Sequence, residues 1–383
     1  MTKIFKTLFL NLIILLALLE LSSFIGIKYN FFAYPSIPSY GKALSFIDTE
    51  WRNELEPWGA WHKKNYVSKS KKSCFDVVYK TNNIGARDNN DYYKNSKGIL
   101  LLGDSFIEGV GVNFEKTFAA KLETLGEKVL NFSSAGDFGP LQEYIIYKQL
   151  ASSFNHDEVI IFFLPANDFT DNSFEYQESL FGKRYRPYFK KNNLGSFDIF
   201  YPDDSKPSDS FPSSERKDSF KLKSFLIDYF YSANLLRQFR LAILGSDPKI
   251  QRIFNEGYGY NFDEKSSIDG VLYYYSELFK SIPQNVIKTF FVIPTDRDLR
   301  EIQSNKWGYR SLYWYQGIKK ITEENNVSLV DLALKNNLPS EELLKKGMDD
   351  WFLKCDGHWN ANGHEYAFTR YLEHKNKKVG SEK

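Results

Sequence analysis

Two observations predict an α/β protein with a parallel sheet, and a third adds a membrane helix. From about residue 96, strand-like runs alternate with helical segments, which implies parallel strands, right-handed crossovers and helices on both faces. The strand-like runs are continuously apolar, as in strands that are buried on both faces. The first 28 residues differ from the rest because they form one long apolar run.

The N-terminal run is long enough to cross a bilayer. From Ile4 to Ile27 the only charged residues are Lys6 and Glu20, and a helix of this length spans roughly 36 Å, against about 30 Å of hydrocarbon. No small-x-small cleavage site follows, which favours an uncleaved anchor at residues 1–28 over a signal peptide. Lys3 and Lys6 stand at the start of the run and only Lys28 closely follows it, so we expect a cytoplasmic N-terminus and an extracytoplasmic remainder, with Glu20 near the outer headgroups.

Composition excludes several classes of protein. The 383 residues are 42% hydrophobic and 26% charged, which suits a globular protein with a sizeable core. The net charge of +2 gives no electrostatic footprint for nucleic acid. The two cysteines, Cys74 and Cys355, are too few for a zinc cage and form at most one disulfide, which the sequence leaves open.

Beyond the anchor we expect one enlarged domain. The predicted segments are a spacer or cap at 29–78, a main domain at 79–375 with an insertion at about 169–285, and a disordered tail at 376–383. The lysine-rich stretch at 63–72 is interpreted as a solvated face rather than a lipid contact. Residues 202–210, rich in Pro, Ser and Asp, are typical of a mobile loop.

The strands are expected at 97–102, 128–132, 158–164, 289–293 and 328–331. Helices are expected from a cap at Asn113 to a stop at Gly126, from Pro140 to about Phe154, and from Ala361 to about Leu372. This order places the chain's candidate chemistry just after the carboxyl ends of strands, where open α/β sheets bind their ligands.

Three of these turns carry groups suited to ester chemistry. Ser105 directly follows the first strand in a tight turn, where a helix N-terminus can support an oxyanion, although Ser or Asp104 as a plain helix cap accounts for the turn equally well. Gly136 can offer a bare backbone N–H, and Asn167 can donate from its amide. Taken singly, these are a loop glycine and a turn asparagine.

The general base can be sought among five histidines. Only His358 has a carboxylate, Asp356, two residues before it and stands in a loop at a helix start. In extended backbone, residues two apart point to one face, which allows a hydrogen bond between them. Asp349 or Asp350 is the alternative acid.

Together these residues resemble the SGNH hydrolases, also called the GDSL family. Gly103-Asp104-Ser105, Gly136, Asn167 and Asp356-x-His358 occur in the order of that family's four blocks. The sequences TNNIGAR at 81–87 and DGHWN at 356–360 are similar to those of its membrane-anchored bacterial branch. The resemblance covers residues 80 to 372.

The resemblance implies a flavodoxin-like three-layer α/β/α sandwich and a set of catalytic roles. Ser105 would be the nucleophile, His358 its base and Asp356 the residue that orients the imidazole. The oxyanion hole would consist of the Ser105 and Gly136 N–H groups with the Asn167 side chain. No cofactor and no metal are implied.

Two departures from the family pattern affect the site. Pro165 stands two residues before Asn167, where the family has glycine, and can aim Asn167 differently. The acid and base are two residues apart instead of three, which resembles the alginate-type O-acetyltransferase branch.

The leading hypothesis is an extracytoplasmic serine esterase that removes acyl groups, in the first place O-acetyl, from a glycan or another cell-envelope ester. The alternatives are an O-acetyltransferase that acts on a cell-surface polysaccharide and an inactive glycan-binding or assembly module. Membrane contact is expected through the anchor alone, and the oligomeric state is left open. Several aromatic residues suit sugar stacking, although a place in the core is the preferred interpretation. They are Tyr258, Tyr260, Tyr273, Tyr274, Tyr275, Trp307 and Trp314.

Overall fold

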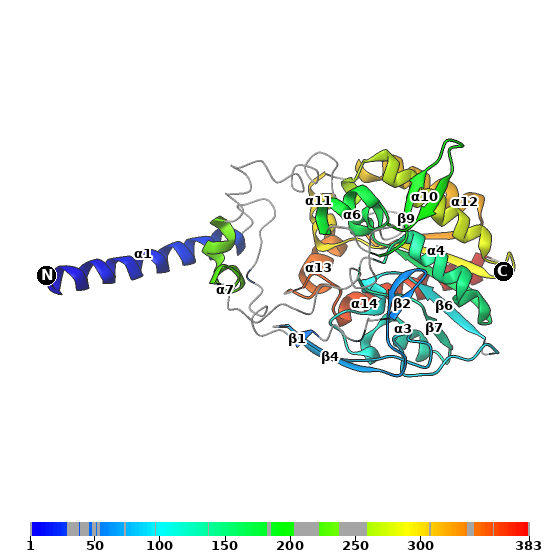
Figure 1. The fold of residues 1–383 in the computed structure, drawn as a ribbon, viewed down its shortest axis with the longest axis horizontal. Coiled ribbons are helices and arrows are strands. Elements are labelled where there is room, and N and C mark those ends of the chain that lie inside the picture. The colour runs from blue at the N-terminus through cyan, green and yellow to red at the C-terminus, as the bar shows by residue number, and fades with distance from the viewer. Residues whose placement is uncertain are drawn as a thin grey trace.

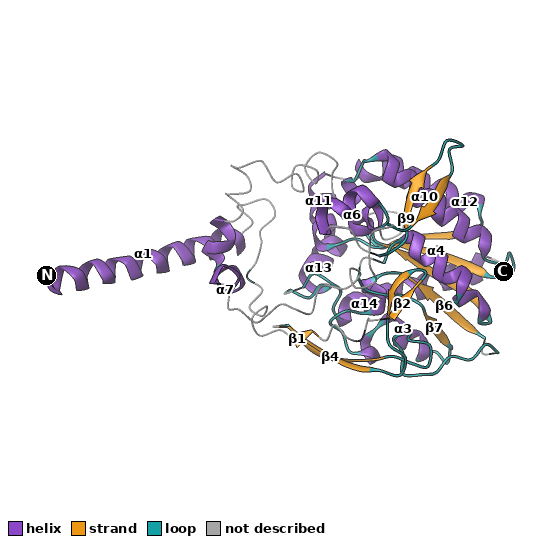
Figure 2. Ribbon diagram, viewed as in Figure 1, coloured by secondary structure: helices purple, strands orange, loops and turns teal. Residues whose placement is uncertain are grey.

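A computed structural model shows a mixed α/β protein with one apolar N-terminal helix (Figures 1 and 2). It describes residues 2–28, 38, 46–47, 51, 54–72, 74–95, 97–136, 138–181, 185–202, 222–236, 259–305, 308–334, 341–354 and 356–381. Most of the expected mobile loop, residues 203–210, lies outside this set, as do Cys355, Tyr258 and Trp307.

A five-stranded parallel sheet forms the centre of the domain. Its strands, in spatial order, are β12 (Ser328–Asp331), β11 (Ile287–Val292), β8 (His156–Phe163), β6 (Gly98–Leu102) and β7 (Val129–Asn131). In chain order this is 5-4-3-1-2, the flavodoxin-like arrangement read from its other edge. The predicted fold class is confirmed, and each expected strand is present within two residues of its predicted bounds.

Alternation of aromatic side chains along the strands produces the three layers. Phe162 and Phe291 stack with ring centroids 4.9 Å apart, and Phe162 meets Phe118 of α3 (Phe118–Glu123). Their chain neighbours Phe163 and Phe290 stack at 5.8 Å on the opposite face. There α10 (Lys265–Ser281) and α12 (Tyr313–Glu324) cover them, while α14 (Ala361–Ser381) packs with α3 on the first face.

Three helix predictions differ from the structure. Asn113 precedes only a 3-10 turn, and Thr117 caps α3 by accepting from the Ala120 N–H at 3.3 Å. The helix that begins at Pro140, α4 (Pro140–Gln149), ends before a short 3-10 turn at Ala151–Ser153. The last helix continues to Ser381, so most of the stretch expected to be a disordered tail is helical.

The segment before the main domain contains strands that pack on it. These are β1 (Phe46–Ile47), β2 (Glu54–Glu56), β3 (Gly59–Trp61), β4 (Val67–Lys72) and β5 (Phe75–Lys80). Trp58 and Trp61 are buried in the main core, so this region acts as a cap. Along β4, Lys69 and Lys71 are exposed as expected of a solvated face, whereas Lys72 is half-buried.

Helix α5 (Pro165–Asp171) follows β8 and leads into the long insertion, which contributes helices α6 (Phe174–Phe181) and α7 (Leu222–Tyr229). It also contributes a hairpin of β9 (Tyr188–Lys191) and β10 (Phe197–Phe200). Of the aromatic residues considered for sugar stacking, Tyr260, Tyr274, Tyr275 and Trp314 are buried in the core, and Tyr273 is half-buried against it. The core interpretation therefore holds for these residues.

Helix α1 (Thr2–Lys28) extends away from the α/β part of the chain (Figure 1). Among the described residues it is the one helix that is long and apolar enough to cross a membrane, over Ile4–Gly26. Its leucine and isoleucine side chains are largely exposed, as a lipid-facing helix requires.

Candidate active site

The turn after β6 places Ser105 at the first position of α2 (Ser105–Glu108). Asp104 caps this helix, since its Oδ1 accepts from the Phe106 N–H at 2.9 Å. A Cβ on Gly103 would lie 3.0 Å from a side-chain atom of Ile107 and 3.2 Å from Cβ of Phe162, so a larger residue would have to push these neighbours aside. Asp104 therefore acts as the helix cap, one of the two interpretations of this turn. The Ser105 hydroxyl does not take part in the cap and is half-buried, so it can also serve the other interpretation.

Ser105, His358 and Asp356 form one hydrogen-bonded chain. The Ser105 Oγ lies 2.8 Å from His358 Nε2, and His358 Nδ1 contacts Asp356 Oδ1. An ionised carboxylate only accepts, so Nδ1 carries the proton and Nε2 accepts from the serine hydroxyl. The arrangement therefore brings a serine hydroxyl, an imidazole and a carboxylate into one line of hydrogen bonds, the geometry that serine-based nucleophilic catalysis requires.

A tight turn, and not extended backbone, brings Asp356 and His358 together. The Gly357 N–H donates to the Leu353 carbonyl at 2.8 Å, and the Leu353 N–H donates to the His358 carbonyl at 2.7 Å. Gly357 has a φ of 91°, a value that favours glycine. The two-residue spacing is thus accommodated by a left-handed glycine between acid and base, which corrects the extended geometry expected from the sequence.

Aromatic packing fixes the imidazole from the side of the nucleophile helix. The Phe106 ring lies 5.2 Å from the His358 ring and meets Trp359 edge to face at 5.4 Å. Trp359 is buried, and its backbone pairs with Phe352 across the loop. Residues adjacent in sequence to Ser105 and His358 therefore hold the two elements together.

The second oxygen of Asp356 pairs with a lysine from the cap. Lys72 Nζ contacts Asp356 Oδ2, and the Asp356 side chain is only 4% exposed. Burial by itself would raise the pKa of Asp356, but the hydrogen bond from His358 and the charges of His358 and Lys72 outweigh it and hold the pKa well below its usual range. Asp356 is therefore ionised at neutral pH.

The other acids proposed for this role are placed differently. The Asp350 side chain is exposed and accepts from the amide of Asn362 at 2.9 Å. The side chain of Asp349 lies outside the described residues. Asp356 alone among the three candidates is seen to meet His358.

A neighbouring contact ties the cap to the same loop. Cys74, next to β4 and two residues after Lys72, is disulfide-bonded. The only other cysteine of the sequence is Cys355, the residue before Asp356, which lies outside the described residues. Through the pair of Lys72 with Asp356, the β4–β5 hairpin is joined to the loop that carries Asp356 and His358.

Gly136 lies beside the nucleophile helix on the loop after β7. The Ser134 N–H donates to the Gly103 carbonyl at 3.2 Å, and the Ala135 N–H donates to the buried Glu108 carboxylate of α2. Gly136 follows with a φ of 95° and is exposed. Within the described part of the chain, neither its N–H nor that of Ser105 donates a hydrogen bond, so both are available to a bound group.

Asn167 is held on α5, where Pro165 occupies the first helical position, which requires no N–H partner. The Asn167 amide donates to Asp171 at 2.9 Å and acts as a hydrogen-bond neighbour of Asp104. Among the described residues it makes no hydrogen bond to Ser105. The amide therefore faces the acids behind the serine turn, in line with the effect expected of Pro165.

Three buried carboxyls lie close enough behind Ser105 to influence one another. They belong to Asp104, Glu143 on α4, and Asp168 on α5. Burial raises the pKa of Asp104 to about 6 and raises the pKa of Glu143 and Asp168 well above the usual range, to which neighbouring negative charges add. Neither oxygen of Glu143 has a hydrogen-bond partner among the described residues.

Lys72, Glu108 and His62 are the site-supporting residues that sequence reasoning missed. His62, assigned to a spacer, is fully buried, with Nε2 3.5 Å from Glu108 Oε2 and Nδ1 2.9 Å from the Gly85 carbonyl. The sequence carried one indirect signal, because Gly85 belongs to the stretch 81–87 that resembles the membrane-anchored branch. Lys72 had no signal, being one of several lysines in its run.

His364 lies behind the site and serves a structural role. Its Nδ1 accepts from the Phe118 N–H at 3.2 Å. Burial, with the charge of Arg87, lowers the pKa of His364 to about 3, so it stays neutral. Arg87 itself donates to the carbonyls of Glu108, Gly109 and Val112 and so fixes the end of α2.

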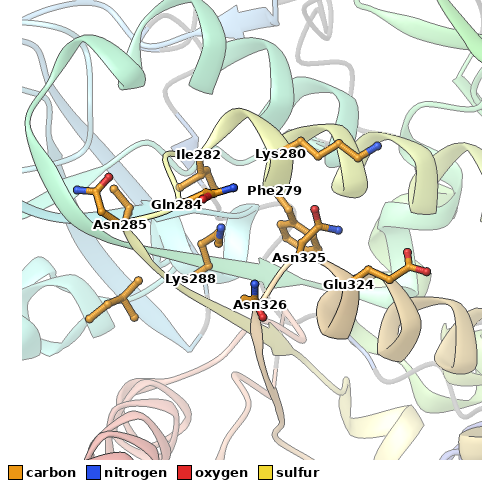
Figure 3. Close-up of a pocket in the computed structure, with 11 residues that line it drawn as sticks. Phe279, Lys280, Ile282, Gln284, Asn285, Lys288, Glu324, Asn325 and Asn326 are labelled. Atoms are coloured by element: carbon orange, nitrogen blue, oxygen red, sulfur yellow. The ribbon is translucent and has the colours of Figure 1, made fainter.

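A polar hollow of about 570 Å³ lies at the other end of the sheet (Figure 3). Lys280, Lys288, Glu324 and Asn325 are among its lining residues, and it opens near the amino end of β11. Ser105 follows the carboxyl end of β6, which runs parallel to β11, so the hollow is remote from the site. Within the described residues no group of three or more His, Cys, Asp or Glu side chains is placed to hold a metal.

Comparison with known proteins adds little to this geometry. No family model matches the chain, and no curated protein matches it either. Among solved structures it is similar to the crystal structure of the lipase/acylhydrolase from Enterococcus faecalis, at 12% identity and a TM-score of 0.35 over 74% of this chain and 96% of that one. A likeness this distant carries no argument, so function is inferred from the residues of the site.

Proposed function

We propose that the protein is a serine ester hydrolase of the SGNH type. The observation that carries the proposal is the hydrogen-bonded chain Ser105–His358–Asp356 at the carboxyl edge of a flavodoxin-like sheet. A serine hydroxyl alone is a poor nucleophile at neutral pH, and a base at 2.8 Å is what activates it.

In this mechanism His358 Nε2 takes the Ser105 proton as Oγ bonds to the ester carbonyl carbon. The tetrahedral intermediate collapses by breaking the bond to the alcohol oxygen, which receives the proton from His358. Water then attacks the acyl carbon while His358 takes its proton, and the Oγ–carbon bond breaks as His358 returns that proton to Ser105 Oγ, which releases the carboxylic acid. Asp356 stays ionised throughout and stabilises the imidazolium.

The oxyanion donors in this proposal are the free N–H groups of Ser105 and Gly136, with Asn167 as the third. Glu108 supports the hole by fixing the Ala135 N–H, which precedes Gly136. Asn167 would have to turn one amide hydrogen from the Asp104 and Asp171 side toward the substrate. Each donor of such a hole usually contributes about 2.7–4 kcal/mol to lowering the barrier.

We further propose that α1 anchors the enzyme in a membrane with its N-terminus in the cytoplasm and the α/β domain outside. Lys3 and Lys6, at the N-terminal end of the apolar stretch, support this orientation. An enzyme held there meets envelope molecules, so the proposed substrates are acyl esters, in the first place O-acetyl esters, of a glycan or another cell-envelope molecule.

One observation favours an O-acetyltransferase as the second candidate. The two-residue spacing of Asp356 and His358, made possible by the Gly357 turn, resembles the alginate-type O-acetyltransferase branch. The acyl-enzyme would form identically, and a sugar hydroxyl in place of water would resolve it. An inactive binding module is disfavoured because such a protein has no need of an assembled serine–histidine pair.

The test uses the full chain, purified in detergent, with a chromogenic acetyl ester in the presence and absence of an oligosaccharide acceptor. Ser105→Ala should abolish turnover, while the matched control Ser152→Ala, at an exposed serine remote from His358, should retain it. Full turnover by Ser105→Ala would overturn the site assignment. Acceptor-dependent acetylation would identify the transferase, and turnover without acceptor would identify the esterase.

A further inference from the structure

The outer end of α1 packs against a segment of the insertion more than 200 residues later in the chain. The Glu20 carboxylate accepts hydrogen bonds from the Tyr231 N–H at 2.6 Å and from the Ser232 N–H at 3.0 Å and hydroxyl at 2.6 Å. The Phe24 ring meets the Tyr231 ring edge to face at 5.1 Å, and Ser23 is buried on the same face of α1. Figure 1 shows α7 beside this end of α1.

The position of Glu20 along α1 determines how deep in a membrane its partners Tyr231 and Ser232 would lie. The stretch spans Ile4–Gly26, so Glu20 lies six residues before its end, or about 9 Å along the helix axis. If α1 crosses the bilayer, the backbone of Tyr231 and Ser232 must reach the same depth to bond this carboxylate. Burial of an acid without such donors would be costly, and here the donors are provided by the insertion.

The same segment presents apolar side chains that are partly exposed. On α7, Leu222 is 60% and Leu226 39% exposed, and Phe230, four residues further on, is 37% exposed. Spacing by four places these three side chains along one face of a helix. Leu236, in the helical residues 231–236, is 61% exposed. An apolar stripe of this kind is typical of helices that lie in the interface of a membrane.

At the break between α7 and the following helix, a side chain supplies hydrogen bonds that water would otherwise supply. Asn234 is fully buried, and its amide donates to the carbonyls of Ile227 at 2.5 Å and Phe230 at 2.9 Å. Carbonyl groups released at a helix break are otherwise satisfied by solvent, which a lipid environment does not supply.

We propose that residues 222–236 are embedded in the outer interfacial layer of the bilayer that α1 spans, with Leu222, Leu226 and Phe230 against lipid and Glu20 as the fastening point. The occupant of this surface is lipid, because the surface continues the lipid-facing surface of α1. The proposal rests on the anchor proposed above and adds a second attachment. Two attachments hold the domain at one height and orientation, whereas a single helix and linker would let it swing.

The test measures the depth of nitroxide labels on the full chain in phospholipid nanodiscs free of other proteins. Labels are introduced at Leu226→Cys and Phe230→Cys, with Ile14→Cys as the lipid control and Leu194→Cys, 91% exposed on the β9–β10 turn, as the water control. Labelling is done without reductant because native Cys74 is disulfide-bonded.

The labels at 226 and 230 should collide with oxygen rather than with a water-soluble nickel chelate, as the label at 14 does. If they resemble the label at 194 while position 14 is in lipid, this proposal is overturned and the anchor stands. If position 14 is also in water, the anchor fails and this proposal falls with it. Protection that occurs only in native membranes would mean that a protein partner covers the surface, which also contradicts the proposal.

The fastening role of Glu20 has its own readout. Glu20→Leu keeps α1 apolar but removes the acceptor for Tyr231 and Ser232. In the Leu226→Cys background it should raise nickel-chelate collisions at least two-fold, with the label at 14 unchanged. An unchanged label at 226 would contradict the role given to Glu20.

Discussion

Two sets of buried carboxyls near Ser105 have opposite electrostatic properties. Asp356 contacts His358 and Lys72, and its pKa is held well below the usual range. Burial raises the pKa values of Asp104, Glu143 and Asp168; other acids add to the rise at Glu143 and Asp168, while hydrogen bonds and the charge of His358 only partly oppose it at Asp104. The comparison teaches that burial alone does not decide whether an acid here is ionised. Asp356 is ionised because it contacts two cationic groups, and among these four acids it is the one that can stabilise an imidazolium at His358.

Removing the imidazole should have the largest effect on activity. His358→Ala leaves Ser105 without a base and Asp356 without its main partner, so kcat should fall on the order of 10⁶-fold, to the level of Ser105→Ala. Initial rates with an acetyl ester measure this. His156→Ala, at a half-buried histidine bonded to Tyr147, is the control and should retain turnover. A loss below tenfold for His358→Ala would refute the assigned base.

Neutralising the acid should have the next largest effect. Asp356→Asn preserves shape but cannot hold the Nδ1 proton in the same way, and a loss of about 10³–10⁴-fold in kcat is expected. The double variant Asp356→Asn with Ser105→Ala should be no slower than Ser105→Ala alone, since the residues act as a unit. Additive losses would indicate that Asp356 acts outside the chain of hydrogen bonds.

Lys72 distinguishes the two sets of carboxyls, and its removal should have an intermediate effect. Lys72→Met should lower kcat about tenfold and move the acid limb of the kcat/KM profile to higher pH, because Asp356 then pairs with protonated His358 alone. Lys72→Arg should rescue both.

Lys71→Met is the matched control, because Lys71 is exposed on the same strand and pairs with Asp76. It should leave rate and profile unchanged. A Lys72→Met enzyme with a wild-type pH profile would mean that the ion pair only contributes to packing.

The buried acids with raised pKa values should affect stability rather than rate. An acid whose pKa is raised by folding contributes its full stabilisation at pH values below its pKa in the unfolded chain. This contribution is lost as the pH rises through its pKa in the folded protein. For Asp104 that window runs from 3.8 to about 6, and for Glu143 it begins at 4.5. The free energy of unfolding should therefore fall as pH rises across this range.

Glu143→Gln should reduce this fall, so that the variant gains stability relative to the wild type as pH rises from 5 to 8. Thermal unfolding of the full chain in detergent at pH 5 and pH 8 measures it, with Glu323→Gln, at an exposed acid on α12, as the control. Equal destabilisation at both pH values would show that Glu143 is needed for packing rather than strained by charge.

Local pattern was sufficient to predict the strands and the order of the site residues. The run before Gly103 is apolar throughout because β6 is buried on both faces, and a short apolar run that ends at a glycine is typical of such a strand. Ser105 was found because it follows a strand and opens a helix. His358 and Asp356 were found because this histidine has a carboxylate two residues before it in a loop that leads into a helix. The helix cap at Thr117 was missed because Asn113 has an equally good capping side chain.

Tertiary contacts could not be predicted in the same way. Lys72 and Asp356 are 284 residues apart, and their pairing depends on how the cap folds over the domain. Glu143 lies on α4, and its burial depends on what packs against that helix. The residues next to it in the sequence do not indicate that Asp104 and Asp168 lie nearby. The direction of the Asn167 amide likewise depends on Asp171 and Asp104.

Covalent trapping tests the central claim most directly. The full chain is treated with an alkyl fluorophosphonate, which reacts with activated serines, and the modified peptide is located by mass spectrometry. The account predicts a single adduct at Ser105 that forms in the wild-type chain and in Ser152→Ala but not in His358→Ala. An adduct at another serine, or labelling of Ser105 that is independent of His358, would contradict it.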